Sequence, residues 1–256
     1  MWCAIGSSSV VRPGTGKKYD GELRILAIDI GGTGLKASVV DAAGKLLVPR
    51  RRIPTPYPCP PSVMLDALAG LVEPLPPHNR IAIGFPGVVR GGNVVTAPHF
   101  GTKDWGEFPL CRAASERFGG LSRMINDAEM QGLAVIRGKG LEFMLTLGTG
   151  AGTGLFRDGA VMPHLELAHH PIYGKKTYNG YIGAAALKKL GKKHWNKRVA
   201  RTIDILADLL HFDHLFVGGG NACKVSIATS SWMTIVSNDA GIEGGAALWR
   251  MSEASA

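Results

Sequence analysis

The chain has 256 residues, of which 45% are hydrophobic and 19% charged, a composition typical of a globular protein with one large domain or two lobes. It argues against an integral membrane protein, because no segment reaches the roughly 18 uninterrupted apolar residues of a membrane span. The net charge of +9 favours a polyanionic partner, whether nucleic acid, an acidic surface or a phosphate-rich substrate.

The start of the chain, MWCAIGSSSVV, lacks the basic flank and apolar core of a signal peptide. The four cysteines are scattered, without a C-x-x-C pair, at Cys3, Cys59, Cys111 and Cys223. Free thiols of this kind indicate a reducing compartment, so we expect a cytoplasmic protein without structural zinc.

Residues 1–22 are rich in Ser, Gly, Lys and Arg and show no periodicity, so we expect a flexible N-terminal tail. Within it, Gly14–Lys17 is partly like a P-loop. That interpretation fails, because Lys18 stands where Ser or Thr is needed and no strand precedes the glycines.

The stretch Leu26–Lys36, read as LAIDIGGTGLK, runs from a buried strand to a carboxylate at Asp29 and then into a glycine turn. Such a turn lets a backbone approach a phosphate closely, and its residues are Gly31, Gly32, Thr33 and Gly34. Asp29 is expected where the strand ends, in position to hold Mg²⁺ directly or through water. The alternative is a buried hairpin whose glycines serve only the turn.

The rest of an N-terminal α/β lobe, residues 23–121, is expected to follow in chain order. The patterns predict a return strand to Asp41, a strand in KLLVPRRRI, a helix over Ser62–Val72, a strand in IAIGF, a turn, a short strand and a long loop over Val88–Trp105, and a helix over Leu110–Phe118. Because no element crosses Gly119–Ser122 in the pattern, we expect the boundary between two lobes there.

A C-terminal α/β lobe, residues 122–256, is expected to begin with a strand, Arg123–Asn126, and a helix, Asp127–Val135. It then repeats the first lobe in outline, with a strand over Glu142–Leu147, a glycine turn over Gly148–Gly154 and a return strand in LFRDGAVM. Two such units, one in each lobe, favour a duplicated fold that closes on a chain of phosphates. In the second turn the candidate phosphate contacts are Gly148, Thr149, Gly150 and Gly152.

Apolar spacing predicts a long helix over Ala184–His211. Four cations fall at successive i,i+4 steps on it and form a basic stripe, Lys189, Lys193, Lys197 and Arg201. Like charges at that spacing repel, so the stripe is either a solvated face or a surface that binds a polyanion.

The chain closes with a strand and glycine turn in HLFVGGGN and a final helix over Ala240–Arg250. Gly218 and Gly219 in that turn can lie against an adenine or a phosphate tail, or can only let a helix pack closely.

Phosphoryl transfer needs positioned phosphates, a divalent metal and an acid–base group at the attacking oxygen. Asp127 is the candidate for that group, because it lies where a strand gives way to a helix at the lobe junction. The helix start is expected to help keep it ionised, and Asn126 beside it can reach a substrate hydroxyl. The alternative is that Asp127 is only a helix N-cap.

Glu166 and His169 form a second polar cluster, in the sequence ELAHH. Paired donors and acceptors suit the several hydroxyls of a sugar. A metal site is the rival interpretation, but no third ligand stands at workable spacing, and a surface loop with incidental histidines is the remaining alternative.

From about Arg24 to Ala247 the sequence resembles the ROK sugar kinases, within the actin-like (ribonuclease-H-like) ATPase superfamily, and is most similar to their polyphosphate glucokinase branch. The motifs that together carry the resemblance are DIGGTGLK, GFPGVVRGGNVVTAP, the loop ending in Trp105, INDAEMQGL, LTLGTGAGTGLF, ELAHH, FVGGG and NDAGIEGGAAL.

The resemblance implies two α/β lobes with glucose in the cleft between them and phosphorylation of its 6-hydroxyl by inorganic polyphosphate, ATP or both. It makes Asp127 the base, with Asn126, Glu166 and His169 as sugar ligands. It implies that the phosphoryl donor and its Mg²⁺ are bound by both glycine turns, by the Gly218–Gly220 turn and by Asp29, Thr33 and Lys36. It also implies a homodimer, and the family's zinc-binding cysteines are absent here.

Three departures from the family pattern bear on these expectations. The motif Glu-x-Gly-His has Ala168 in place of glycine, His99 stands where the branch usually has Asn, and the Lys-rich segment Tyr173–Trp195 diverges. The basic balance and the stripe favour polyphosphate as the donor. The alternatives are an ATP-only ROK hexokinase for another sugar, a non-catalytic sugar-binding protein, and a DNA-binding regulator, for which 22 irregular residues supply no helix-turn-helix.

Overall fold

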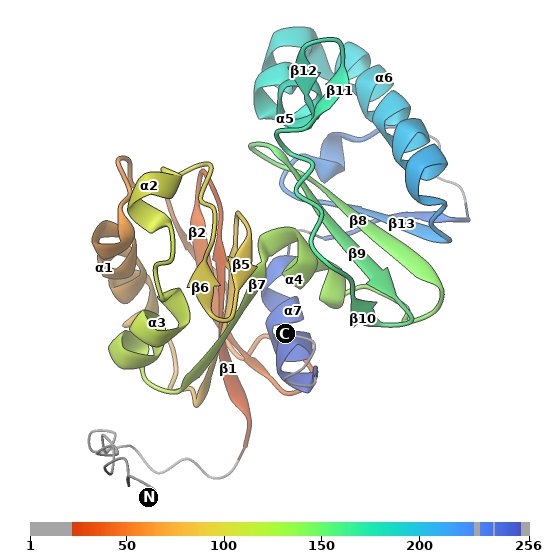
Figure 1. The fold of residues 1–256 in the computed structure, drawn as a ribbon. Helices are drawn as coiled ribbons and strands as arrows, with labels where there is room; N and C mark the ends of the chain where they lie inside the picture. The colour runs from red at the N-terminus through yellow and green to blue at the C-terminus, as the bar shows by residue number, and fades with distance from the viewer. Residues whose placement is uncertain (1–21, 228–230, 238, 252–256) are drawn as a thin grey trace, which may run out of the picture.

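The computed structural model describes residues 22–227, 231–237 and 239–251, which form two lobes, each built on a five-stranded sheet (Figure 1). The first sheet has the order β3-β2-β1-β4-β7. Its strands are β1 (Arg24–Ile30), β2 (Leu35–Asp41), β3 (Arg51–Ile53), β4 (Arg80–Phe85) and β7 (Leu121–Asn126).

The second sheet has the order β10-β9-β8-β13-β14. Its strands are β8 (Leu141–Leu147), β9 (Ala151–Arg157), β10 (Ala160–Val161), β13 (His214–Gly218) and β14 (Met233–Ile235). The central strand, β1 in one sheet and β8 in the other, pairs antiparallel with the next strand of the chain, β2 or β9, and parallel with β4 or β13. At the edges, β3 and β10 pair antiparallel with their neighbours, whereas β7 and β14 pair parallel. The duplicated fold predicted from the two glycine turns is therefore present in the strand order itself.

Alternating side chains of the central strands fill separate apolar layers, because successive residues of a strand point to opposite faces of the sheet. Leu26 and Ile28 of β1 pack on the outer face with α1 (Pro61–Val72) and α3 (Leu110–Phe118), whereas Ile25 and Ala27 face the inner layer. In the second lobe the outer layer lies under α5 (Tyr178–Ile182) and α6 (Ala184–Leu210).

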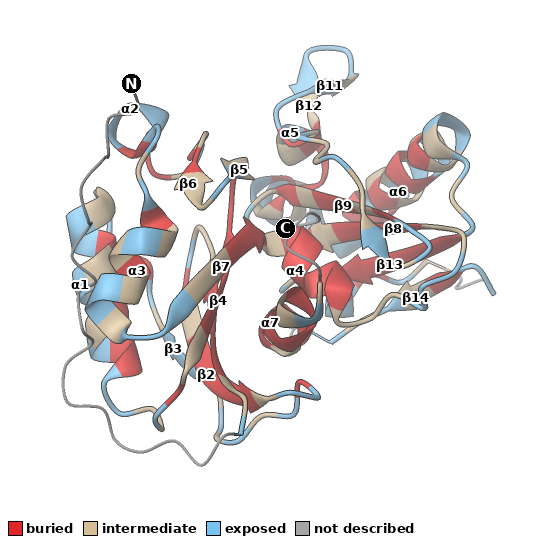
Figure 2. Ribbon diagram, turned by 60° about the horizontal axis from the view of Figure 1, so that its bottom comes forward, coloured by how far each residue is buried: buried red, intermediate tan, exposed pale blue. Residues whose placement is uncertain are grey.

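The inner layer between the sheets contains two helices, α4 (Asp127–Leu133) and α7 (Ala240–Arg250), which Figure 2 shows buried along most of their length. Their close crossing depends on a glycine, since a Cβ at Gly244 would collide with the carbonyl oxygen of Met130. Helix α7 also contacts β1, β2 and β4, so the last helix of the described chain completes the first lobe.

Smaller elements surround the cleft. Two short hairpins and two short helices complete the secondary structure, β5 (Val89–Arg90) with β6 (Asn93–Val94), β11 (Pro171–Tyr173) with β12 (Lys176–Thr177), α2 (Thr102–Trp105) and the 3₁₀ helix η1 (Ala222–Lys224). The turn, short strand and long loop predicted over Val88–Trp105 are thus a hairpin of two short strands followed by a loop that ends in a short helix. β14 and α5 were not expected from the sequence.

Strand pairing differs from the predicted lobe boundary at residues 119–122. Strand β7 follows that point but pairs with β4 along its whole length, from Leu121 to Asn126. We therefore propose that the first lobe extends through Asn126 and is completed by α7. The predicted tail, apart from Glu22, lies outside the described residues.

The predicted long helix is α6, but it is kinked at Gly191, whose φ of 72° and ψ of 164° are not helical. The kink separates Lys189 from the three later cations of the basic stripe, which all lie beyond it. The continuous stripe expected from i,i+4 spacing is therefore wrong at its first member, because only the residues after Gly191 share one helical register.

Candidate active site

A pocket of about 480 Å³ lies between the lobes, and most of the predicted site residues line it. Those that do are Asp29, Gly31, Gly32, Thr33, Gly34, Lys36, Asn126, Asp127, Gly148, Thr149, Gly150, Gly152, Glu166, His169 and Gly219. Gly218 lies behind the pocket wall, where a Cβ would meet Met144 and Gln131, and the basic stripe lies elsewhere on α6.

The first glycine turn is held by four hydrogen bonds to its carbonyl groups, one of them from the Arg52 guanidinium to the Thr33 carbonyl at 3.4 Å. The Gly31 N–H donates to the Gly34 carbonyl at 3.1 Å, while the Thr55 and Tyr57 hydroxyls donate to the Gly31 and Gly32 carbonyls at 2.7 and 2.6 Å. With its carbonyls engaged, this side-chain-poor backbone forms a rigid wall that a ligand can approach closely.

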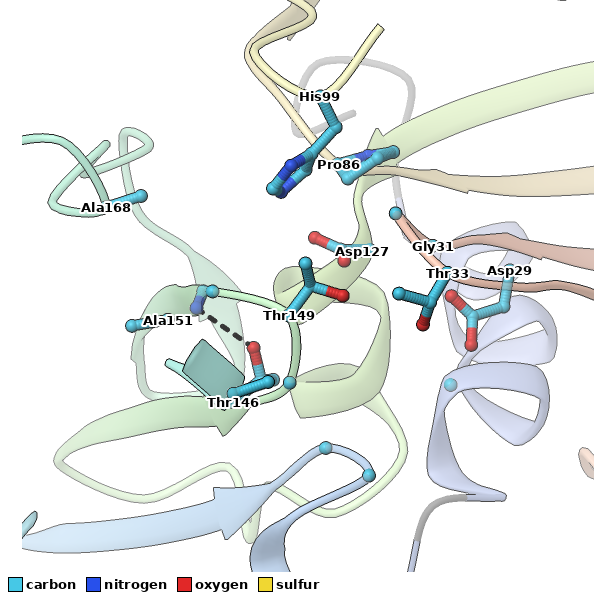
Figure 3. A pocket seen from close by; sticks show the side chains of 18 of the residues that line it. Asp29, Gly31, Thr33, Pro86, His99, Asp127, Thr146, Thr149, Ala151 and Ala168 are labelled. Carbon is cyan, nitrogen blue, oxygen red and sulfur yellow. Dashed lines mark hydrogen bonds between the residues drawn. The ribbon is translucent and has the colours of Figure 1, made fainter. Parts of the chain in front are cut away.

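The second turn is shorter than predicted, because β9 already begins at Ala151. Its tip closes through the Gly148 N–H, which donates to the Gly150 carbonyl at 2.9 Å. Beyond the tip, the Ala151 N–H donates to Asn179 Oδ1 at 2.7 Å and the Gly152 N–H to Thr146 Oγ1 at 3.1 Å. Figure 3 shows this turn presenting Thr149 to the pocket on the side that faces Asp127.

Asp29 lies at the end of β1, as predicted, and is only 9% exposed. Its Oδ2 forms an ion pair with Lys36 Nζ at 2.7 Å. The register of the hairpin sets this pair, because Asp29 and Lys36 lie directly opposite each other on β1 and β2. A Cβ at Gly241 of α7 would lie 3.0 Å from the same oxygen. One carboxylate beside an open phosphate-sized pocket fits Mg²⁺, which keeps several waters and takes few protein ligands.

Asp127 is the first residue of α4, and its carboxylate lies at the centre of the pocket in Figure 3, between Thr149 and the Thr33 turn. Burial, and after it the charge of Asp29, raises the pKa of the Asp127 carboxyl to about 7, against the Ala128 N–H and Lys36, which lower it. The expectation that the helix start keeps it ionised is therefore wrong, since desolvation outweighs the helix dipole.

Asn126, not Asp127, is the N-cap of α4, which contradicts the alternative that Asp127 serves only as a cap. The Asn126 side chain accepts from the Ala128 N–H at 2.9 Å and donates to the carbonyls of Phe85 and Gly87 at 3.3 and 3.2 Å. Both ends of the Asn126 amide are thus engaged within the protein, Oδ1 at the start of α4 and the NH₂ group at the end of β4 and just after it.

The predicted sugar cluster lies on the loop between β10 and β11. Burial alone would raise the pKa of Glu166, but the hydrogen bond and charge of His164 outweigh it and lower that pKa. His99 faces this cluster from the first lobe, where burial and then the charge of His169 lower its pKa. An anionic carboxylate and imidazole groups thus share one side of the pocket.

The two departures in the sugar cluster are accommodated. Ala168 is buried without a left-handed φ, and its N–H donates to Glu166 Oε1 at 3.2 Å, so the added methyl introduces no backbone strain. The His99 ring packs over the first turn, where a Cβ at Gly32 would lie 3.3 Å from it.

Several pocket residues were missed by sequence reasoning. They are Arg52, which lies against Gly34, and Gln131, Thr146, Asn179, Asn221 and Gly241. Only the Asn126-x-x-Glu129 capping-box spacing gave a readable signal for another neighbour, Glu129.

The basic stripe forms no single surface. Lys193 and Lys197 line a second hollow of about 570 Å³ together with Lys192, Asn196, Ala200, Ser226 and Ile227. Arg201 instead stacks on the Tyr173 ring, 4.4 Å from its centroid. The hollow lies close to the active-site pocket along the chain, because η1 and Val225 are all that separate Asn221 of that pocket from Ser226 of the hollow.

The described residues contain neither a cluster of metal ligands nor a helix that could span a membrane. In residues 22–227, 231–237 and 239–251, no three His, Cys, Asp or Glu side chains are grouped as a metal site. None of the helices in the part of the chain that the structure describes is both long and apolar enough to cross a membrane.

Two sheets of one strand order that close on a glycine-lined pocket define the actin-like two-lobe fold, as predicted. An inorganic polyphosphate/ATP-glucomannokinase from Arthrobacter sp. strain KM superposes with a TM-score of 0.79 at 29% identity, covering 90% of this chain and 100% of that one. A ROK family glucokinase from Streptomyces griseus, solved with glucose and AMPPNP, has a TM-score of 0.71 at 20% identity, covering 89% and 99%.

The chain belongs to the ROK family, whose model matches residues 25–166. A polyphosphate glucokinase of Mycobacterium tuberculosis is 30% identical over 222 residues, 82% of this chain and 81% of that protein. A polyphosphate glucokinase of Mycobacterium leprae is 29% identical over 223 residues, 84% and 68%. The family resemblance inferred from the sequence motifs is confirmed.

Proposed function

We propose that this protein phosphorylates glucose at its 6-hydroxyl, with inorganic polyphosphate, ATP or both as the donor. Membership in the ROK family supports sugar kinase activity, and the similarity to polyphosphate glucokinases and to a polyphosphate/ATP-glucomannokinase supports the finer assignment. The products are glucose 6-phosphate and a donor shortened by one phosphoryl group.

The observation that carries the proposal is the placement of Asp127 between the two glycine turns, with its pKa raised to about 7. A general base is most effective when its pKa is near the operating pH. As the sugar oxygen forms its bond to the terminal phosphorus, the bond from phosphorus to the bridging donor oxygen breaks. Asp127 takes the hydroxyl proton, and the shortened donor leaves with the bridging oxygen.

The remaining pocket residues have proposed roles that follow from their chemistry. Glu166 and His169 bind sugar hydroxyls, and Asn126, which lines the same pocket, is a further sugar ligand. The two glycine turns and Gly219, with Thr33, Thr149 and Lys36, hold the donor phosphates. Mg²⁺ at Asp29 would supply charge neutralisation of the transferring phosphoryl group.

For polyphosphate, we propose that the chain continues from the pocket toward the hollow lined by Lys192, Lys193 and Lys197. These exposed cations suit a linear polyanion, whereas the described lining of the hollow offers no aromatic ring for a base. The proposed partners are therefore a sugar and polyphosphate and not nucleic acid. The homodimer implied by the family resemblance stays a prediction.

The test is a coupled assay for glucose 6-phosphate with each donor, on the protein and on Asp127→Asn. We expect turnover in the wild type and a loss of at least about 10³-fold in kcat for the variant, with glucose binding retained. Asp66→Asn is the matched control, since Asp66 is exposed, pairs with Arg117 at the surface and lies outside the pocket.

Different outcomes separate the alternatives. Turnover with ATP but none with polyphosphate at low salt would remove the polyphosphate donor. Turnover with mannose or N-acetylmannosamine in place of glucose would indicate a ROK hexokinase for another sugar. Sugar binding without turnover from either donor in the wild type would indicate a non-catalytic sugar-binding protein.

A further inference from the structure

His164 connects two carboxylates that come from different elements of the fold. It precedes the sugar cluster on the loop after β10, and its side chain is 16% exposed. Its Nδ1 lies 2.7 Å from Oε1 of Glu129 on α4, and its Nε2 lies 3.5 Å from Oε2 of Glu166. The ring therefore bridges the loop to the helix that begins with Asp127.

Glu129 is itself part of the start of α4. Its other oxygen, Oε2, accepts the Asn126 N–H at 3.3 Å in the capping box, and its side chain is 6% exposed. A carboxylate this buried needs a donor on each oxygen, because an unpaired buried charge is strongly unfavourable. His164 is the donor on Oε1.

Glu166 is oriented from two sides. The Ala168 N–H fixes Oε1, and Oε2 faces His164, while the Thr153 hydroxyl donates to the neighbouring Leu165 carbonyl. Without His164, Oε2 of Glu166 would lose its cationic partner, and the loop would lose the contact that His164 makes with Glu129 of α4. The loop would keep the hydrogen bond from the Thr153 hydroxyl to the Leu165 carbonyl.

The electrostatics agree with this geometry. Burial opposes a charged His164, but the hydrogen bond to Glu129, the 3.5 Å ion pair with Glu166 and the charges of both carboxylates raise its pKa to about 9. The ring is therefore cationic between two carboxylates at neutral pH. The titratable and charged groups around this cluster are Glu129 from α4, Glu166 and His169 from the loop, and Asp127 and His99, each of which interacts electrostatically with Glu166.

We propose that His164 is a positioning residue. It orients Glu166 for the sugar and links the loop between β10 and β11 to the start of α4, the helix that carries Asp127. The proposal rests on the proposed function, because it assumes that Glu166 binds the sugar. The histidine acts through Glu166 and does not itself contact the substrate.

The test compares His164→Gln with His170→Gln, a matched control because His170 lies on the same loop, is exposed and directs its side-chain Nδ1 to the Pro171 carbonyl, away from the two carboxylates that His164 bridges. Glutamine can still donate to Glu129 but carries no charge. We expect the KM for glucose to rise about tenfold or more in His164→Gln with kcat changed less than about threefold, and both constants to stay near wild type in the control. A KM within about twofold of wild type would overturn the proposal.

A second readout keeps the test decisive if His164→Gln folds poorly. As the pH rises through about 9, wild-type His164 loses its proton and Glu166 loses its cationic partner. The KM for glucose should then rise in the wild type, while in a folded His164→Gln it should be high and flat across the same range. A wild-type KM that stays constant from about pH 7 to pH 10 contradicts the proposal.

Titration calorimetry with glucose, mannose and N-acetylmannosamine separates this inference from the proposed function. If the wild type binds a sugar without turnover, the kinase assignment fails, and the change in dissociation constant of His164→Gln still decides the role of His164. If the wild type and the variant bind that sugar equally, the positioning role fails even where the kinase assignment stands.

Discussion

Asp127 shows how local environment overrides position on a helix. A carboxylate in the first turn is stabilised in its charged form by about 0.3–1 kcal/mol when it is exposed. In the pocket, burial and the neighbouring charge of Asp29 act in the opposite direction and raise its pKa to about 7. The local pattern predicts the position of this residue but not its ionisation, because the charge of Asp29 comes from a strand almost a hundred residues earlier.

The raised pKa predicts the acid limb of the pH profile. Asp127 must be ionised to accept a proton, so kcat/KM should fall about tenfold per pH unit below about pH 7. The measurement is kcat/KM for glucose at saturating donor and Mg²⁺, from about pH 5 to pH 8. A profile that is flat over this range would show that Asp127 is not the limiting base.

The raised pKa of Asp127 also makes the stability of the folded protein depend on pH. A carboxyl whose pKa is raised by folding is favoured in its protonated form, so its contribution to stability is lost as the pH rises through the folded pKa of about 7. Asp127→Asn should therefore have a higher Tm than the wild type at about pH 8, and the difference should shrink at about pH 5. Thermal unfolding of both proteins at the two pH values checks this, and a lower Tm for the variant at the higher pH would contradict it.

Residues that act by themselves in a turn were predictable, whereas residues that act as pairs were not. The turn glycines, Thr33 and Thr149 were identified from local pattern. The pair of Glu129 and His164 spans 35 residues, and nothing in the sequence around either member indicates the other.

At the scale of elements, prediction was most accurate where local chemistry decides the structure. The helix over Ala240–Arg250 and the first glycine turn match the structure to the residue. The second turn was predicted too long, because the glycines of β9 were assigned to it. They lie in the strand since α4 passes over it, and a Cβ at Gly154 would lie only 3.2 Å from Cα of Glu129.

The crossing of α4 and α7 makes a prediction about Gly244. Gly244→Ala should lower the free energy of unfolding by about 2 kcal/mol or more, because the added methyl collides with the backbone of Met130. Gly70→Ala in α1 is the matched control, since nothing lies within 4 Å of its Cβ position.

The control substitution should instead raise stability by about 0.5–1 kcal/mol, as expected for an exposed glycine within a helix. Denaturant unfolding measures both variants. Equal stabilities of the two variants would mean that the helices can separate without cost at their crossing.

For the whole molecule, the net charge of +9 indicated a polyanionic partner but not where it binds. The structure divides the basic stripe at Gly191 and leaves Lys193 and Lys197 together in the second hollow. A charge count has no direction in space, so only the folded chain separates cations that share a surface from those that do not.

This division predicts unequal effects on the polyphosphate donor. Lys193→Ala with Lys197→Ala should raise the KM for polyphosphate about tenfold at low salt and weaken its dependence on salt, while the KM for ATP changes little. Lys189→Ala is the matched control on the other side of the kink and should have a much smaller effect. Equal losses in both proteins would restore the continuous stripe that the sequence suggested.

The position of α7 at the end of the described chain affects how the first lobe folds during synthesis. The strands of the first sheet leave the ribosome early, but the helix that covers their inner face is translated only after the whole second lobe. Until then, apolar residues such as Ile25 and Ala27 have no covering layer. We therefore expect the nascent first lobe to expose apolar surface of the kind that chaperones bind, and to reach its native state only after the second lobe has been translated.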